Sequence, residues 1–138
     1  MEYTNYGNTG LRVSRVGLGC GGHSRLGLFS GGESVARGGV KHALDLGINF
    51  YDTARIYGTE HVVGDVLFTE RQHCVFSTKT LVLDRDGNFI SPERIIKSLE
   101  KSLSRLRTDY IDIFNLHGVR PKELEFCLQN YIEPLLKE

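Results

Sequence analysis

The sequence predicts an α/β protein in which helices cover a parallel β-sheet. Short apolar segments alternate with segments whose apolar residues recur at helical spacing, and this unit repeats four times. The short segments are almost continuously apolar, which is typical of parallel strands buried on both faces. At 138 residues, the chain has the length of one ordinary domain.

The chain opens with a predicted hairpin. Turn-forming residues in "NYGNTG" precede alternating apolar residues, which lead into a first strand that ends near residues 17–20. A glycine-rich loop, "GGHSRLGLFSGG", is followed by a helix over residues 33–46, which Gly47 ends. The second strand is "INFYD", and it ends at Asp52.

Two further units follow. Thr59 is expected to cap a helix in "TEHVVGDVLFT", and "CVFSTK", residues 74–79, is the third strand. The clearest helix begins in "SPERIIKSLEKSLSRLRTDY", where Ser91 caps the first turn and Pro92 takes the first helical position. The fourth strand is "YIDIFNLH", residues 110–117, and a last helix over residues 120–138 is expected to be interrupted at Pro134.

Two architectures share this order of elements. One is the first half of a (β/α)8 barrel, a fold that takes ~250 residues when complete. The other is an open, doubly wound dinucleotide-binding sheet, because Gly17, Gly19 and Gly22 match the pattern G-x-G-x-x-G after a strand. That pattern should open a helix directly, whereas a long loop follows here, and Asp52 lies further from Gly22 than the ~20 residues expected.

The composition excludes several classes of partner. Lys plus Arg equals Asp plus Glu at 17 each, so neither nucleic acid nor an anionic membrane is an expected partner. The N-terminus lacks the apolar core of a signal peptide, and no apolar run approaches ~18 residues. We therefore expect a cytoplasmic protein. The cysteines at 20, 74 and 127 form neither a zinc pattern nor a disulfide framework, so we expect free thiols and no metal site.

Polar residues follow or end each of the last three predicted strands. Asp52 ends the second strand with Tyr57 in the loop beyond it, Lys79 ends the third, and His117 ends the fourth. In parallel α/β folds the carboxyl ends of the strands line one rim, where ligands bind. Each residue alone has an ordinary structural explanation, such as a cap, a surface position or a packed side chain. The coincidence of all four on one predicted rim favours a functional site.

This set of side chains suits proton transfer to a carbonyl oxygen. A phenol is a weak acid at neutral pH, and a nearby ammonium favours its deprotonated form. Asp52 could hold Lys79 in place, Lys79 could activate Tyr57, and His117 could donate to the carbonyl oxygen or relay a proton. None of these groups supplies a hydride, so reduction would need a nicotinamide cofactor.

The segments "FYDTARIYG", "FSTK" and "FNLHG" resemble the signatures of the aldo-keto reductase family, in the same order. The opening "YGNTGLRVSRVGLGCGG" resembles that family's hairpin and first strand, and "SLEKSLSRLRTDYIDIFNLH" resembles the helix and strand that precede its histidine. The resemblance implies a (β/α)8 barrel, an NADP(H)-linked reductase acting on a small carbonyl or alcohol, and a catalytic tetrad at Asp52, Tyr57, Lys79 and His117. Tyr57 would be the general acid.

The resemblance also implies what residues 1–138 contain. They match the N-terminal half of the barrel and stop after the fourth strand–helix unit, whereas most of the family's cofactor contacts lie in the second half. On this chain the cofactor side would consist of Asp52 and the loop of Gly19, Cys20, Gly21 and Gly22. We therefore expect a fragment that is inactive alone, or a non-enzymatic interaction module of the same fold.

A half-barrel also predicts exposed surfaces. Its first and fourth strands would be open edges, and inward-facing side chains, including Val75, Ile111 and Ile113 or the residues that alternate with them, would be uncovered. The expected partners are consequently a complementing second half-barrel or a second copy of this chain.

Overall fold

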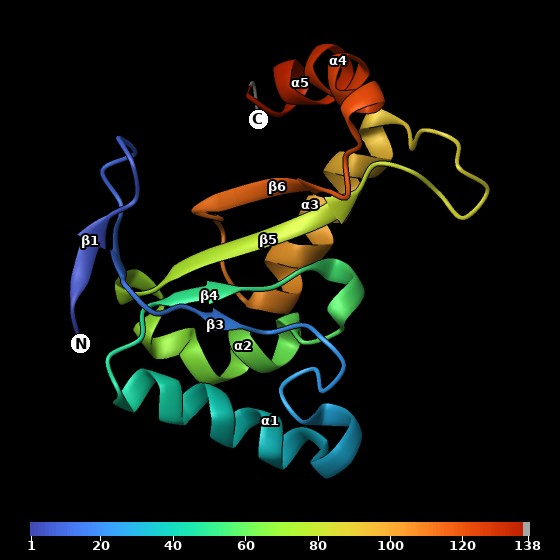
Figure 1. Ribbon diagram of the computed structural model, residues 1–138. Helices are drawn as coiled ribbons and strands as arrows, with labels where there is room; N and C mark the ends of the chain where they lie inside the picture. Colours follow the sequence, from blue (N-terminus) through green and yellow to red (C-terminus); the bar gives the residue numbers. More distant parts are fainter. Residues whose placement is uncertain (137–138) are drawn as a thin grey trace.

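The computed structural model describes residues 1–136, which form a two-stranded hairpin and a four-stranded parallel sheet (Figure 1). In the hairpin, β1 (Tyr3–Asn5) pairs antiparallel with β2 (Arg12–Ser14). The order of the parallel strands is β3 (Leu18–Gly19), β4 (Phe50–Asp52), β5 (Val75–Leu81) and β6 (Ile113–His117). This consecutive order confirms the predicted half-barrel. It excludes the doubly wound alternative, in which the first strand would lie inside the sheet.

The helices are α1 (Leu28–Asp45), α2 (Glu60–Leu67) and α3 (Pro92–Leu106), and they lie together on one face of the sheet (Figure 1). Short helical turns occupy Arg55–Tyr57, Phe68–His73 and Pro121–Glu123. A last helical segment comprises α4 (Leu124–Cys127), a π-helical turn (Leu128–Ile132) and α5 (Glu133–Leu135). No helix among residues 1–136 is both long enough and apolar enough to cross a membrane.

Two helix ends and one cap differ from the prediction for local reasons. α1 begins before residue 33, because an additional turn precedes Gly32, whose φ of 71° and ψ of −170° kink the helix. α3 ends at Leu106, because Arg107 takes a left-handed conformation with φ of 53°. Thr59 takes the predicted N-cap position of α2, but its side chain makes no capping bond, since its hydroxyl donates instead to the carbonyl of Cys20 at 2.9 Å.

The last helix is interrupted before Pro134 and not at it. Proline lacks an N–H group, which removes one hydrogen bond from the helical ladder. The wider π-helical turn Leu128–Ile132 lies just ahead of this position, and the ladder resumes where the Leu136 N–H donates to the Ile132 carbonyl at 3.0 Å. The predicted residues 137–138 lie outside the described part of the chain.

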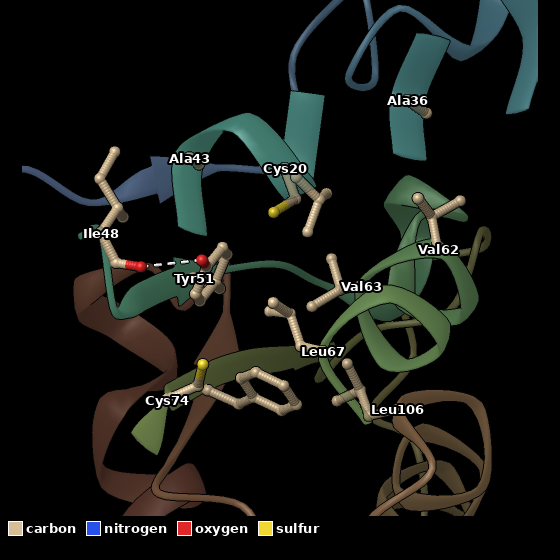
Figure 2. Close-up of a cluster of buried hydrophobic side chains, with 12 residues drawn as sticks. Cys20, Ala36, Ala43, Ile48, Tyr51, Val62, Val63, Leu67, Cys74 and Leu106 are labelled. Carbon is tan, nitrogen blue, oxygen red and sulfur yellow. Dashed lines mark hydrogen bonds between the residues drawn. The ribbon is translucent and has the colours of Figure 1, made fainter. Parts of the chain in front are cut away.

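The main core fills the space between the sheet and the three helices (Figure 2). Tyr51 of β4 and Phe76 of β5 meet edge to face, with ring centroids 6.2 Å apart. Val63 and Leu67 of α2 pack against them, and both are fully buried. The Tyr51 hydroxyl reaches the carbonyl of Ile48 at 2.8 Å, so the buried phenol keeps a hydrogen-bond partner.

α2 and α3 approach most closely at Gly64. A Cβ atom at Gly64 would lie 2.5 Å from the carbonyl oxygen of Arg105 and 2.5 Å from the carbonyl carbon of Leu106. Those atoms belong to the backbone of the last turn of α3 and cannot rotate away. Only glycine therefore allows this helix packing.

A buried arginine joins β5 to β6 at the end where these strands begin. Arg71 lies between the rings of Phe76 and Tyr110, with its guanidinium carbon 4.2 and 3.8 Å from the two centroids. It donates to the carbonyl of Cys74 at 2.7 Å and forms an ion pair with Asp112 at 2.8 Å. The Asp112 carboxylate also accepts the backbone N–H of Phe76 at 2.8 Å, so it ties the two strands together.

The inner face of the sheet is covered at one end, which corrects part of the prediction. Val75 was expected to be uncovered, but it is only 7% exposed. Its cross-strand neighbour Phe50 packs against the ring of Tyr6 in the hairpin, at 5.8 Å between centroids. Ile111 does not face inward as expected, since it packs against the helix-side core, and Ile113 is half-buried. The hairpin therefore covers the inner face of this half-barrel at the end where the parallel strands begin.

Candidate active site

The register of the parallel strands brings the predicted rim residues together. Asp52 ends β4 and pairs with Ser77, while Lys79 of β5 pairs with Asn115 of β6. Side chains two residues apart point to the same face of a strand. Asp52, Lys79 and His117 consequently share the inner face, near the carboxyl ends of their strands.

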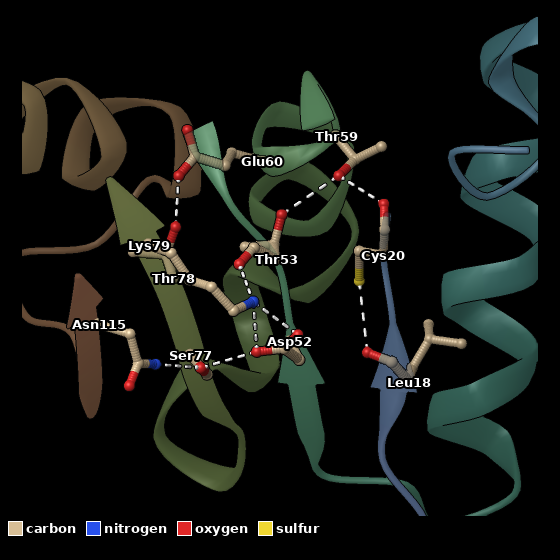
Figure 3. A network of polar contacts seen from close by, with 10 residues as sticks. All are labelled: Leu18, Cys20, Asp52, Thr53, Thr59, Glu60, Ser77, Thr78, Lys79 and Asn115. Carbon is tan, nitrogen blue, oxygen red and sulfur yellow. Dashed lines mark hydrogen bonds and ion pairs between the residues drawn. The ribbon is translucent and has the colours of Figure 1, made fainter. Parts of the chain in front are cut away.

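Lys79 is held by a carboxylate and a carbonyl (Figure 3). Its ammonium nitrogen lies 2.8 and 2.7 Å from the two carboxylate oxygens of Asp52, and 2.9 Å from the carbonyl oxygen of Thr53. The Lys79 side chain is 18% exposed and that of Asp52 is 38% exposed. The predicted contact between Asp52 and Lys79 is thus present, in a partly desolvated setting.

Tyr57 lies beside this ion pair, in the helical turn that follows β4. The Lys79 nitrogen is 5.4 Å from the centroid of the Tyr57 ring, within the ~6 Å of a cation–π contact. The ring also packs closely on residue 21, because a Cβ at Gly21 would lie 2.6 Å from a Tyr57 ring carbon and the ring would have to move. The glycine-rich loop therefore forms a wall against the phenol.

His117 meets the Tyr57 ring edge to face, with centroids 5.8 Å apart and an interplanar angle of 85°. Its Nδ1 atom is buried and has no hydrogen-bond partner among the described residues. Burial lowers the pKa of His117, and the Lys79 charge lowers it further, while Asp52 acts in the opposite direction. The imidazole is therefore neutral at pH 7.

Two residues of the network were not assigned a role from the sequence. The Ser77 hydroxyl donates to Asp52 at 2.9 Å, and the Asn115 amide donates to the Ser77 oxygen at 3.2 Å. These contacts extend the chain of polar groups from β4 across β5 to β6 (Figure 3). Strand periodicity could have identified both residues, because Ser77 precedes Lys79 by two positions and Asn115 precedes His117 by two.

The four residues of the expected cofactor loop differ in whether they are exposed and so able to contact a cofactor. Cys20 is fully buried in the main core, its N–H donates to the Asp52 carbonyl at 2.8 Å, and its own carbonyl accepts from Thr59. Burial and the nearby Asp52 raise the pKa of the Cys20 thiol to about 12, so it stays protonated. Gly19 and Gly22 are exposed, and a Cβ at either position would meet nothing within 4 Å.

An open pocket of about 350 Å³ adjoins the Tyr57 ring. Its lining residues are Gly22, His23, Arg25, Phe29, Ile56 and Tyr57. The Arg25 guanidinium stacks on the Phe29 ring at 4.7 Å, which gives this pocket both an apolar and a cationic wall. The arrangement offers space for a small organic molecule next to the phenol.

Comparison with known proteins identifies the family. The profile of the aldo/keto reductase family matches residues 18–135. This chain belongs to that family. In the aldo-keto reductase YhdN of Bacillus subtilis, 37% of 132 aligned residues are identical, covering 88% of this chain and 39% of that protein. For the L-galactose dehydrogenase of Arabidopsis thaliana, identity is 37% over 145 residues, covering 99% of this chain and 44% of that protein.

Solved structures of aldo-keto reductases share the fold. The holo form of the enzyme AKR11C1 from Bacillus halodurans superposes with a TM-score of 0.81 at 32% identity, covering 99% of this chain and 46% of that one. An aldo-keto reductase from Klebsiella pneumoniae in complex with NADPH superposes with a TM-score of 0.68 at 27% identity, covering 91% of this chain and 41% of that one. The chain thus spans about two fifths of the length of the curated relatives named above, in the N-terminal half of the fold.

Proposed function

We propose that this chain is the first half of an NADP(H)-dependent carbonyl reductase in which Tyr57 donates the proton. The observation that carries the proposal is the position of the Lys79 ammonium, bound to Asp52 and 5.4 Å from the Tyr57 ring centroid. The NADPH complex of the Klebsiella pneumoniae relative supports the choice of cofactor.

The residues present fit one edge of a nicotinamide site. Gly19 pairs with Asp52 across β3 and β4, and no atom would contact a Cβ built on it. Asp52 and the glycine edge at Gly19 and Gly22 would therefore border a flat ring, and the remaining contacts would come from a second half-barrel. NADPH, when bound, supplies the hydride that the carbonyl carbon of the substrate receives.

The residues of this chain would transfer the proton to the substrate oxygen. Tyr57 donates its phenolic proton to the substrate oxygen, and the Lys79 ammonium stabilises the phenolate that remains. Asp52 and the Thr53 carbonyl hold that ammonium in place. His117 is neutral and its Nδ1 has no partner among the described residues, so in the tautomer that carries the proton on Nε2 it would donate to the same substrate oxygen.

The sheet edges favour a second candidate function, that of an interaction subunit. β3 and β6 are the outer strands of the sheet, so each has one side without a partner in the described chain. Such edges pair readily with another strand. We infer that the chain acts together with a complementing half-barrel or with a second copy of itself.

The test compares this chain alone with the same chain joined to the second half of a relative's barrel. Alone, it should neither bind NADPH tightly in a fluorescence titration nor reduce an aromatic aldehyde. Joined, it should do both, and Tyr57→Phe should lower kcat by at least ~100-fold without weakening NADPH binding. Tyr6→Phe is the matched control, because Tyr6 is exposed and belongs to the hairpin, at the end of the sheet opposite the rim, and phenylalanine keeps the ring that packs on Phe50.

Retained turnover in the Tyr57→Phe variant would exclude Tyr57 as the acid. A joined protein that folds and binds NADPH but does not reduce aldehydes would favour the interaction subunit.

A further inference from the structure

A second polar pocket lies outside the site described above, between the turn after β4 and helix α3. Its volume is about 210 Å³, and its lining consists of Arg55, Arg94, Lys97, Ser98 and Lys101. Arg55 belongs to the turn Arg55–Tyr57, whereas the other four residues belong to α3. Residues three and four apart are neighbours on a helix surface, so α3 presents a row of cations to this pocket.

These four cations are without ion-pair partners among the described residues. Within residues 1–136, none of the four takes part in an ion pair or a side-chain hydrogen bond. By contrast, Arg105, one turn further along the same row, pairs with Glu60 at 3.5 Å. The positive charge of the row is therefore balanced by a carboxylate at Arg105 but not at the pocket.

The carboxylates near the pocket have other principal partners. Asp84 has a lowered pKa chiefly because of the Asn88 backbone N–H, and Arg94 adds only a minor contribution. Glu93 has a lowered pKa chiefly because of the Ser91 hydroxyl, and Lys97 is again a minor contributor. Neither carboxylate lines this pocket, which has four cations in its own lining, although Asp84 and Asp86 line the adjacent pocket together with Arg55 and Arg94.

Like charges within the row add a small repulsion, which a bound anion would relieve. Arg94 and Lys97 are three residues apart and Lys97 and Lys101 are four apart, which are the spacings at which like charges destabilise a helix. At the pocket, the Ser98 hydroxyl is buried and is bonded to the Thr80 hydroxyl at 2.8 Å. When Thr80 donates this bond, the Ser98 proton is free to donate to a bound ligand.

We propose that this pocket binds a small anion carrying two phosphoryl groups. Arginine guanidinium groups match the oxygens of phosphate with paired hydrogen bonds, and lysines add charge. The volume is below the ~300 Å³ of a site for a drug-sized ligand, which suits phosphoryl groups and not a whole nucleotide. The ligand source is either free diphosphate or a phosphate ester such as a sugar bisphosphate.

Calorimetry on the full 138-residue chain tests this directly, without any reductase activity. Pyrophosphate and a sugar bisphosphate are titrated separately at low ionic strength, where charge attraction is least screened. We expect saturable binding at one site. The double variant Lys97→Gln/Lys101→Gln should weaken it by at least ~10-fold, and Arg55→Gln by at least ~3-fold. Lys41→Gln, at an exposed lysine of α1, is the matched control and should stay within ~2-fold of the parent.

Each outcome is decisive. Tighter binding of pyrophosphate assigns the site to free diphosphate, and tighter binding of the bisphosphate assigns it to phosphate esters. Absence of saturable binding overturns the proposal, as does equal binding of citrate, which would indicate attraction to charge alone. An unchanged affinity in Arg55→Gln would also overturn the proposal, because it would mean that the anion binds to the basic face of α3 and not in the pocket.

Discussion

Replacing Gly64 with alanine tests the close packing of α2 against α3. The added Cβ would lie 2.5 Å from backbone atoms of Arg105 and Leu106, whereas ordinary contact begins at 3.4 Å, so the helices must separate by roughly 0.9 Å. Overpacking typically costs about 1–3 kcal/mol, and rigid backbone neighbours place this case at the upper end. Alanine returns up to ~1 kcal/mol of helix propensity. We expect a net destabilisation of about 2 kcal/mol.

The matched control is Gly38→Ala in α1. A Cβ at Gly38 would contact nothing within 4 Å, so this variant should gain up to ~1 kcal/mol from helix propensity alone. Urea unfolding followed by far-UV circular dichroism measures both variants against the parent. The midpoint should fall for Gly64→Ala and rise for Gly38→Ala. A Gly64→Ala midpoint equal to or above that of the parent would refute the packing argument.

Two further predictions follow from the buried charges. Arg71→Met should destabilise the fold by about 3–5 kcal/mol in the same urea assay, because it leaves the Asp112 carboxylate, 12% exposed, without its charged partner; a loss below ~1 kcal/mol would contradict this. In an NMR titration, the pKa of His117 should lie below the ordinary ~6.5, and Lys79→Met should raise it; an unchanged pKa in that variant would contradict the charge coupling. Since the unfolded chain protonates this histidine more readily, its contribution to stability should decrease as pH falls through ~6.5.

The rim was predictable because its signals are local. Asp52, Lys79 and His117 each lie at or near the end of an apolar strand, and the parallel arrangement alone is enough to align those ends. The same reasoning gave the strand order. It also gave the positions of the helices to within a few residues, except where Gly32 adds a turn to α1.

The features that could not be predicted are close approaches between distant segments. Gly21 looks like any loop glycine until the ring of Tyr57 is placed against it, and Gly64 looks like a helix defect until α3 is packed on α2. The covering of the inner face by the hairpin is also a contact between segments far apart in the sequence. Nothing near Val75 in the sequence indicates that the hairpin, through Tyr6 and Phe50, would pack at that end of the sheet.

The Arg71–Asp112 pair has a consequence for protein engineering. Asp112 aligns β6 on β5 just before the first paired residues, whereas Lys79 and His117 act at the opposite end of the strands. Loops at the rim could therefore be exchanged or grafted without altering how these two strands are aligned. A single residue inserted between Asp112 and His117 would instead turn the histidine toward the helices, because strand faces alternate with every residue.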